Sequence, residues 1–374
     1  MDRTADIAIV GAGIVGLAHA YMALKKGHRV VLFDRDEFAV GASVRNFGLI
    51  WGIGQEPGVL LDRALRSRSH WQTIAEKAGF WLNNNGSMHV AYHDDEWNVL
   101  QEFMELYSDA SYECKLVSPT DIEQLSPVIK TGGLRGGLYS ETESTVYARE
   151  AIRKIPFWLE QQFGLILKRG HVVTEISIPH IKTARESWKV GQVFVCSGAD
   201  FETLYPEVFD QYPVVKCKLQ MMKATSSKKI KLGPTLCAGL TLRHYPAFAK
   251  CRSLKLLDAR YDNISKEFKD HGIHVLLAQN AAGEFIIGDS HHYSRTVEPF
   301  DSEHINNVIL DYLETFAELG KLQINERWHG VYPKVQGASN LIVSPEKGVT
   351  IVTGLGGAGM TLSFGLAEEM IDAL

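Results

Sequence analysis

The first hydrophobic pattern along the chain changes period twice within 34 residues. Residues 7–10 form a short apolar run, which predicts a buried parallel β-strand. Apolar side chains then recur at helical spacing up to residue 26, and residues 29–33 form a second apolar run. Gly27 lies between the helical pattern and the second apolar run, at the position where a glycine commonly ends a helix. The order predicts a strand, a helix and a second strand at the start of the chain.

Helical and alternating patterns continue through the remaining sequence. Helical spacing predicts helices over residues 60–78, from Asp94 or Asp95 as N-cap to about residue 107, and over 147–163 and 301–321. Alternation predicts strands at 88–92 and 193–196, and mainly strands from 213 to about 321, with a turn at 281–283. Residues 349–353 read as a last strand, followed by a closing helix capped by Thr361 or Ser363.

Composition narrows the class of protein without choosing a function. With 374 residues, 45% of them hydrophobic and 22% charged, the chain has room for two ordinary globular units. A net charge of −5 gives no support to nucleic-acid binding, and no apolar run approaches the roughly 20 residues of a membrane span. The first residues carry no targeting pattern, and the five cysteines are scattered without a disulfide or zinc spacing. We therefore expect a cytoplasmic protein with reduced thiols.

A glycine motif joins the first strand to the first helix. Gly11, Gly13 and Gly16 have the G-x-G-x-x-G spacing, in which the glycines allow a tight turn, a close pyrophosphate and close helix packing. The helix N-terminus offers free N–H groups to the phosphates. Asp34 ends the second strand, where an acid accepts hydrogen bonds from ribose hydroxyls. This combination predicts that the chain binds a dinucleotide.

Two later glycine sites favour a flavin over a nicotinamide cofactor. Ser197 and Gly198 follow a β-run, and a glycine-rich turn spans residues 354–359 before the last helix. A simple NAD dehydrogenase needs only the first motif with its acid. A reduced flavin carries negative charge at one edge of its ring, and the N-terminus of the last helix would stabilise that charge.

Four segments together resemble the D-amino acid oxidase, glycine oxidase and sarcosine oxidase family of FAD enzymes. They are GAGIVG with Asp34, the loop GASVRNFG at 41–48, CSGA at 196–199 and TGLGGAGMT at 353–361. The resemblance implies an α/β fold, α+β overall. It implies a discontinuous Rossmann-like FAD-binding domain of residues 1–82, 143–212 and 326–374, interleaved with an antiparallel-sheet substrate domain of residues 83–142 and 213–325.

The same resemblance implies which residues contact FAD. They are Gly11, Gly13, Ile14, Val15, Gly16, Asp34, Arg35, Ser43, Arg45, Asn46, Phe47, Gly48, Val173, Ser197, Gly198, Gly354, Gly356, Gly357, Gly359, Met360 and Thr361. It implies oxidation of a C–N bond, in which a neutral amine gives hydride to flavin N5 and the imine is hydrolysed, with oxygen or another acceptor taking the electrons. A dedicated general base is not required, and the sequence nominates none.

The chain departs from the family at the substrate site. Amino acid oxidases of the family hold the substrate carboxylate with the Arg of a G-L-R-P-like motif, and the matching stretch here is WHGVYP, with Tyr332 at that position. A phenol cannot make the bidentate clamp, so an ordinary α-amino acid is disfavoured. Gly330 stands where covalent sarcosine oxidases have a nearby Cys, so FAD should be noncovalent.

Several cationic or polar residues are candidates to replace that clamp. They are Tyr332, Lys334, Arg45, Arg243 and His244. His291 and His292 have no metal-ligand partner at suggestive spacing, so we interpret them as a structural pair and expect no metal. RNFGLIW at 45–51 with LRHYPAF at 242–248 resembles a branch of the family associated with phosphonate breakdown. That branch implies an aminoalkylphosphonate or its N-methyl derivative as substrate.

Other functions stay open at this stage. One alternative is a flavin dehydrogenase that oxidises C–OH and passes electrons to a quinone-type acceptor, although no Trp- and Lys-rich amphipathic membrane helix is evident. Another is an amino acid oxidase of the glycine or sarcosine type. A third is a non-catalytic protein that FAD stabilises.

Overall fold

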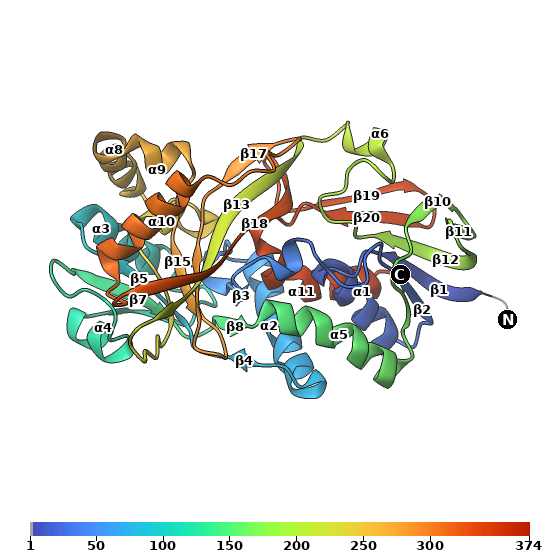
Figure 1. Cartoon of the computed structure of the whole chain (residues 1–374), viewed down its shortest axis with the longest axis horizontal. Coiled ribbons are helices and arrows are strands. Elements are labelled where there is room, and N and C mark those ends of the chain that lie inside the picture. The colour runs from blue at the N-terminus through green and yellow to red at the C-terminus, as the bar shows by residue number, and fades with distance from the viewer. Residues whose placement is uncertain (1–2) are drawn as a thin grey trace.

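The structure is a computed structural model that describes residues 3–374, and its first sheet is built around the N-terminal strand (Figure 1). The strand order is β10-β11-β12-β1-β2-β9, and β20 adds to β12 and carries β19. The strands are β1 (Thr4–Val10), β2 (Val30–Phe33), β9 (Ile166–Lys168), β10 (Val173–Ser177), β11 (His180–Thr183), β12 (Ser187–Val195), β19 (Leu341–Glu346) and β20 (Val349–Thr353). Strand β1 runs parallel to β2 and to β12, and β12 runs parallel to β20, as the apolar runs predict.

Alternate residues of β1 and β2 enter two different cores. Ile7 and Ile9 pack with the helices, whereas Ala8, Val31 and Phe33 pack on the other face. The helices of this unit are α1 (Ile14–Lys25), α2 (Val59–Ala78), α5 (Ala148–Phe163), α6 (Pro206–Phe209) and α11 (Gly359–Asp372). Burial on both faces explains why the predicted strands are continuously apolar. The β–α–β unit predicted from the first 34 residues is therefore confirmed, and Gly27 follows α1 with a φ of +87°.

The second large sheet lies at the other end of the molecule (Figure 1). Its order is β17-β13-β16-β15-β14-β5-β7-β6, with β18 on β13, and it is antiparallel except for the parallel pair β5–β14. The strands are β5 (Ser87–Ala91), β6 (Cys114–Val117), β7 (Gly136–Ser140), β13 (Val214–Ser226), β14 (Thr235–Cys237), β15 (Leu276–Gln279), β16 (Phe285–Gly288), β17 (His292–Ser294) and β18 (Leu322–Val335). A small third sheet joins β3 (Leu49–Ile50), β8 (Ser144–Val146) and β4 (Leu82–Asn83).

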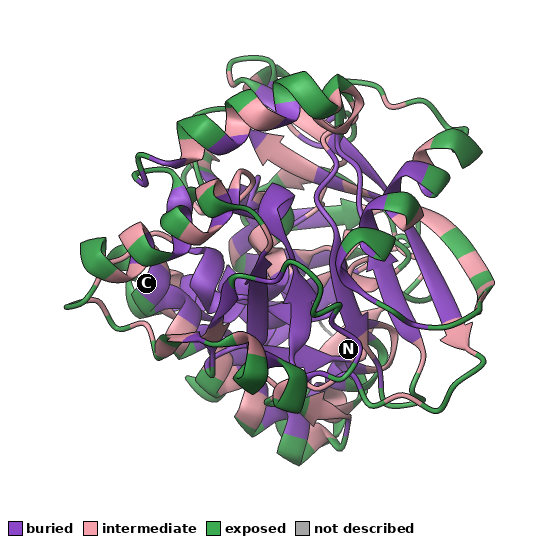
Figure 2. Cartoon of the chain, turned by 90° about the vertical axis from the view of Figure 1, so that its left-hand side faces the viewer, coloured by how far each residue is buried: buried purple, intermediate pink, exposed green. Residues whose placement is uncertain are grey.

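Helices surround this sheet, and some of them were not predicted. They are α3 (Asp94–Leu106), α4 (Pro119–Leu125), α7 (Gly239–Leu242), α8 (Leu254–Ile264), α9 (Lys266–Asp270) and α10 (Glu303–Phe316). The prediction of mainly strands over 213–321 is wrong for α7 to α9. Helix α7 is a single buried turn, and α8 and α9 bury few residues, so none of them has a clear helical apolar pattern. The hairpin turning at 281–283 and the helix within 301–321 are confirmed. Figure 2 shows central strands buried and the outer sides of the helices exposed.

Two predicted helix caps are wrong. Helix α11 begins at Gly359, so Thr361 and Ser363 lie inside its first turns. Helix α3 begins with His93 as N-cap, and the carboxylate of Glu96 accepts the N–H of His93 at 3.2 Å, so neither Asp94 nor Asp95 is the cap. Local composition placed both helices correctly, but the capping residue depends on where the preceding chain enters.

The long strands β13 and β18 connect the two large sheets. They pair antiparallel from Val214 opposite Val335 to Ser226 opposite Leu322, and Lys334 forms a bridge with Leu355 in the last glycine turn. The pairing brings the end of β18 to the turn that precedes α11. The domain boundaries given above stay a prediction. Among residues 3–374, we find no helix long and apolar enough to cross a membrane.

Candidate functional site

The N-terminal glycine turn packs against the strand beside it. Gly11 has a φ of +103°, and a Cβ there would clash with the carbonyl oxygen of Cys196. A Cβ on Gly16 would clash with the carbonyl oxygen of Gly11, so α1 rests directly on the turn. The N–H of Ile14 donates to Oγ of Ser43 at 2.9 Å, and the first turn of α1 has no acidic residue. The positive end of α1 is thus available to an anion.

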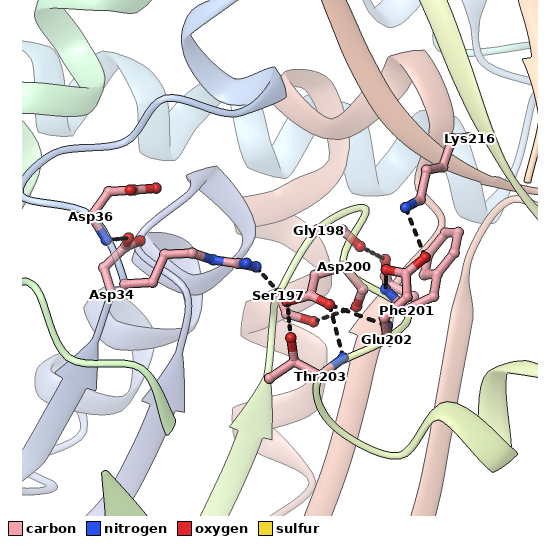
Figure 3. A network of polar contacts seen from close by, with 11 residues as sticks. Asp34, Asp36, Ser197, Gly198, Asp200, Phe201, Glu202, Thr203 and Lys216 are labelled. Atoms are coloured by element: carbon pink, nitrogen blue, oxygen red, sulfur yellow. Dashed lines mark hydrogen bonds and ion pairs between the residues drawn. The ribbon is translucent and has the colours of Figure 1, made fainter. Parts of the chain in front are cut away.

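Asp34 is held beside this turn by backbone groups. Its Oδ2 accepts the N–H of Ala12 at 2.6 Å. Its Oδ1 accepts the N–H of Asp36 at 2.9 Å (Figure 3). A carboxylate has about four acceptor sites, so lone pairs remain for ribose hydroxyls. The acid is oriented before a ligand arrives.

The loop after β12 is ordered by one carboxylate. Oδ1 of Asp200 accepts the N–H groups of Glu202 and Thr203, and Oδ2 accepts the Thr203 hydroxyl at 2.7 Å (Figure 3). Arg35 forms an ion pair with the same Oδ2. Oγ of Ser197 donates to the carbonyl of Asp200 at 3.2 Å. Arg35 and Ser197, both predicted to contact FAD, are therefore engaged in holding this loop.

The last glycine turn lies at the N-terminus of α11. Gly356 has a φ of +58°, and the first turn of α11 carries no acidic residue. Oγ1 of Thr361 accepts the N–H of Trp51 at 2.9 Å, which joins α11 to the loop after β3. A second positive helix end therefore faces the same interior as the first.

A cavity of about 320 Å³ extends from the first glycine turn to the end of β18. The predicted residues that line it are Gly13, Ile14, Val15, Ser43, Arg45, Asn46, Phe47, Gly198, His244, Tyr332, Lys334, Gly354, Gly356, Gly357, Gly359, Met360 and Thr361. Within the described chain, the predicted residues outside its lining are Gly11, Gly16, Asp34, Arg35, Gly48, Val173, Ser197 and Arg243. Val173 is buried in β10, opposite Thr183. The structure thus brings three distant glycine sites to one cavity.

Tyr332 lies where the cavity passes the last glycine turn. Its side chain is buried, with 6% of the residue exposed, and it pairs with Cys217 across β13 and β18. A Cβ built on Gly357 would lie 3.8 Å from the Tyr332 hydroxyl, so this hydroxyl points towards the turn. Burial raises the pKa of Tyr332 well above its ordinary value, so the phenol stays protonated and can donate a hydrogen bond.

The other candidate cations differ in how far they reach the cavity. Lys334 lines it, with Nζ 3.4 Å from the hydroxyl of Tyr293 and 5.0 Å from the centre of that ring. Arg45 also lines it, and Nη1 donates to the carbonyl of His329 at 3.3 Å. Arg243 instead forms an ion pair with Asp258. Arg243 was a candidate because it precedes His244 in the sequence, but its side chain pairs with Asp258 and does not line the cavity.

The fold brings three histidines together that are far apart in the sequence. His244, His274 and His291 each offer a ring nitrogen within 4.8 Å of the others. The rings of His244 and His274 stack with centroids 3.8 Å apart, and those of His274 and His291 are 4.9 Å apart. The interpretation of His291 and His292 as structural residues stays a prediction, and the fold adds that His291 has ring partners from other segments. His292 is exposed on β17.

Sequence reasoning missed several residues at this end of the cavity. His274, Asp289, Trp51, Tyr245 and His291 all line it. They come from four segments, with Asp289 and His291 in one loop, and no two of them form a recognisable motif. The one available signal was that several histidines flank predicted strands. The order of residues in the sequence does not show that these histidines lie close together in space.

The chain fits a flavin dinucleotide on three observations. Gly13 allows close approach, since a Cβ there would lie 3.0 Å from Oγ of Ser43. The N-termini of α1 and α11 both border one cavity, and neither helix has an acidic residue in its first turn, as a pyrophosphate and an anionic ring edge each require. Asp34 stands beside the first turn to hold the ribose.

Comparisons with known proteins agree with this fit. Residues 6–373 match the family described as "DAO: FAD dependent oxidoreductase". Glycine oxidase of Geobacillus kaustophilus (strain HTA426) is 23% identical over 156 residues, which cover 40% of this chain and 41% of that protein. Mitochondrial sarcosine dehydrogenase of Mus musculus is 24% identical over 150 residues, covering 39% of this chain and 16% of that protein. The chain thus spans less than half the length of either curated relative.

Solved structures share the fold over almost the whole chain. L-proline dehydrogenase from P. horikoshii superposes with a TM-score of 0.81 at 19% identity, covering 100% of this chain and 93% of the other. Glycine oxidase from Geobacillus kaustophilus gives a TM-score of 0.79 at 18% identity, covering 100% and 94%. Because the family match extends over nearly all of the sequence, the chain belongs to the DAO family of FAD-dependent oxidoreductases, and FAD is its cofactor.

Proposed function

We propose that the chain oxidises the C–N bond of a small anionic amine, with an aminoalkylphosphonate or its N-methyl derivative as the substrate class. The observation that carries this proposal is the pair Tyr332 and Lys334 on β18, which line the cavity beside the last glycine turn. Tyr332 stands where family members with amino acid substrates are expected to have Arg. The anion is therefore held by several separate donors.

A phosphonate suits such a set of donors. Near neutral pH it approaches two negative charges and presents three acceptor oxygens, more than a carboxylate offers. Lys334 supplies a positive charge, Tyr332 a protonated hydroxyl, and Arg45 a guanidinium at the edge of the same cavity. Donors from different directions fit a tetrahedral group better than a planar one.

The residues of the chain bind and orient the substrate in this proposal. FAD, when bound, supplies the two-electron oxidant for the carbon next to nitrogen. The amine thereby becomes an imine, and water converts the imine to a carbonyl compound and a free amine. Leu219, Met221 and Leu276 line the cavity with apolar surface, which limits water around the reacting carbon. The noncovalent attachment of FAD belongs to the same proposal, since Gly330 occupies the place of the expected Cys.

Anaerobic reduction of the bound flavin tests the substrate class. The visible flavin absorbance of the purified FAD-containing protein is followed after addition of 2-aminoethylphosphonate, its N-methyl form, glycine, sarcosine or glycerol phosphate. We expect one or both phosphonates to reduce the flavin fastest. Reduction confined to glycine and sarcosine would reject the phosphonate, and reduction by glycerol phosphate alone would reject amine oxidation. Peroxide release in air then identifies oxygen as an acceptor.

A further inference from the structure

A compact histidine group lies in the substrate end of the cavity. His244 follows α7, His274 precedes β15, and His291 lies between β16 and β17. All three line the cavity, and one ring nitrogen of each lies within 4.8 Å of the others. Asp289 lines the same part of the cavity and is buried. Three imidazoles and a carboxylate are thus collected from three places in the sequence, because Asp289 and His291 share the loop between β16 and β17.

The second nitrogen of two of these rings already has an acceptor beside it. Nδ1 of His291 is 3.0 Å from the carbonyl oxygen of Gly272, so Nδ1 carries the proton and Nε2 keeps its lone pair. Nε2 of His274 is 3.1 Å from Oδ1 of Asp289, although the angles do not form a hydrogen bond. Nδ1 of His274 is buried and has no hydrogen-bond partner among residues 3–374. A carbonyl and a carboxylate behind two imidazoles is the arrangement that orients histidine ligands around a metal ion.

We propose that His244, His274 and His291 bind one divalent transition-metal ion of the Zn²⁺ type, with Asp289 and the Gly272 carbonyl orienting two of the ligands. Imidazole nitrogen is a preferred donor for zinc, cobalt, nickel and copper. Three protein ligands leave a fourth position for water or an anion, as in open zinc sites. All three histidines line the cavity, so this position is reachable from the substrate side.

The present ring positions need a small adjustment to hold the ion. Zinc–nitrogen bonds of about 2.0–2.1 Å place tetrahedral ligand nitrogens roughly 3.3 Å apart. The three ring nitrogens here lie within 4.8 Å of one another. The rings of His244 and His274 are inclined by 23°, and those of His274 and His291 by 18°, so the lone pairs must turn to converge. The ring of His244 stacks on that of His274 with centroids 3.8 Å apart, so it must turn within this packed group to bind the ion.

The chain contains a second group with which this site can be compared. Glu267, His271 and His304 also offer three ligand atoms within 4.8 Å. Glu267 and His304 already form an ion pair, and the group lies towards the surface, outside the cavity lining. Substitution of a histidine in this second group is therefore a matched control, because it removes a histidine without changing the cavity.

Cobalt binding tests the proposal without any amine substrate. The FAD-containing protein is treated with chelator and then titrated with Co²⁺, and visible d–d absorption is followed as a difference spectrum against the oxidised flavin. We expect one tightly bound Co²⁺ that Zn²⁺ displaces. His274→Ala and His291→Ala should abolish the signal, His271→Ala should leave it unchanged, and Asp289→Asn should weaken affinity on the order of 10- to 100-fold.

A localisation experiment covers variants that fail to fold. Crystals of the unaltered protein soaked with Zn²⁺ are expected to give one anomalous peak between His244, His274 and His291. Absence of Co²⁺ uptake by the unaltered protein, a peak only at Glu267, or loss of the cobalt signal in His271→Ala would each overturn the proposal. These measurements use no amine. A negative result would therefore reject the metal site without bearing on the proposed amine oxidation.

Discussion

The two ends of the cavity are built from different parts of the polypeptide. At the cofactor end, glycine turns and the N-termini of α1 and α11 present backbone groups. At the proposed substrate end, the side chains of Tyr332, Lys334, His244 and His291 line the cavity from β18 and two loops. The first end depends on backbone conformation, and the second depends on how strands pair.

This difference explains why one end is recognisable from sequence. A glycine turn, a helix start and an acid at the end of a strand are local, so they recur at fixed spacing. A side-chain site depends on register, as where Tyr332 lies opposite Cys217 and Lys334 opposite Val215. Substitutions at the two ends should therefore change different measured quantities.

The largest expected effect comes from a side chain in the first glycine turn. In Gly16→Val, the new side chain would clash with the carbonyl of Gly11, so α1 could not rest on the turn. We expect loss of FAD from the purified protein and a lower melting temperature. Flavin absorbance relative to protein absorbance, together with thermal unfolding, measures both.

Gly132→Ala is the matched control for that substitution. A Cβ on Gly132 meets nothing within 4 Å, and its φ is not in the left-handed range. We expect normal FAD content and a free energy of unfolding within about 0.5 kcal/mol of the parent. Retention of FAD by Gly16→Val would show that the turn does not control cofactor binding.

Low pH should destabilise both the unit that contains α1 and the second large sheet, because each contains one buried histidine. Burial lowers the pKa of His19 in α1 to about 4 and that of His89 in β5 to about 3. The unfolded chain binds these protons below about pH 6.5 and the folded chain does not, so stability is lost as pH falls from 6.5 towards 4 and 3. For His19 the loss reaches up to about 3 kcal/mol at pH 4.

Urea unfolding at a fixed excess of FAD measures this dependence. The slope between pH 6.5 and 4 should become shallower in His19→Gln, whereas His180→Gln on exposed β11 should keep the parent slope. An unchanged slope in His19→Gln would mean that another group governs acid unfolding.

The same contrast describes what the sequence could predict about the fold. Period-two and helical patterns gave the β1–α1–β2 unit, the hairpin of β15 and β16, and helix α10, because each has its own apolar signal. Helices α8 and α9 were missed because few of their residues are buried. The histidine group could not be predicted, since its members meet only after β15, β16 and the loop near α7 are assembled.

A conservative change at the substrate end should lower turnover without removing FAD. Tyr332→Phe keeps the ring that packs beside Cys217 and removes only the hydroxyl. If that hydroxyl donates to a charged substrate, its loss corresponds to about 1.5–3 kcal/mol, or roughly 10- to 100-fold in kcat/KM. Steady-state kinetics with flavin content measured in parallel gives the result.

Tyr139→Phe provides the corresponding control, because Tyr139 lies on β7 away from the cavity lining. Its kcat/KM should match that of the parent protein. Equal kinetics for Tyr332→Phe and the parent would remove Tyr332 from the substrate site and leave Lys334 and Arg45 as the anion-binding candidates.

The smallest effect is expected for Arg243, which the sequence alone ranks beside His244. Its guanidinium pairs with Asp258 at the outer side of the fold and does not line the cavity within the described residues. In Arg243→Gln we expect kcat/KM within about twofold of the parent, and a free energy of unfolding lower by less than about 1 kcal/mol because the pair is partly exposed. A loss of kcat/KM as large as that of Tyr332→Phe would mean that the loop after α7 turns inward when substrate binds. The separation between residues that the fold directs into the cavity and those it directs outward would then hold only for the free enzyme.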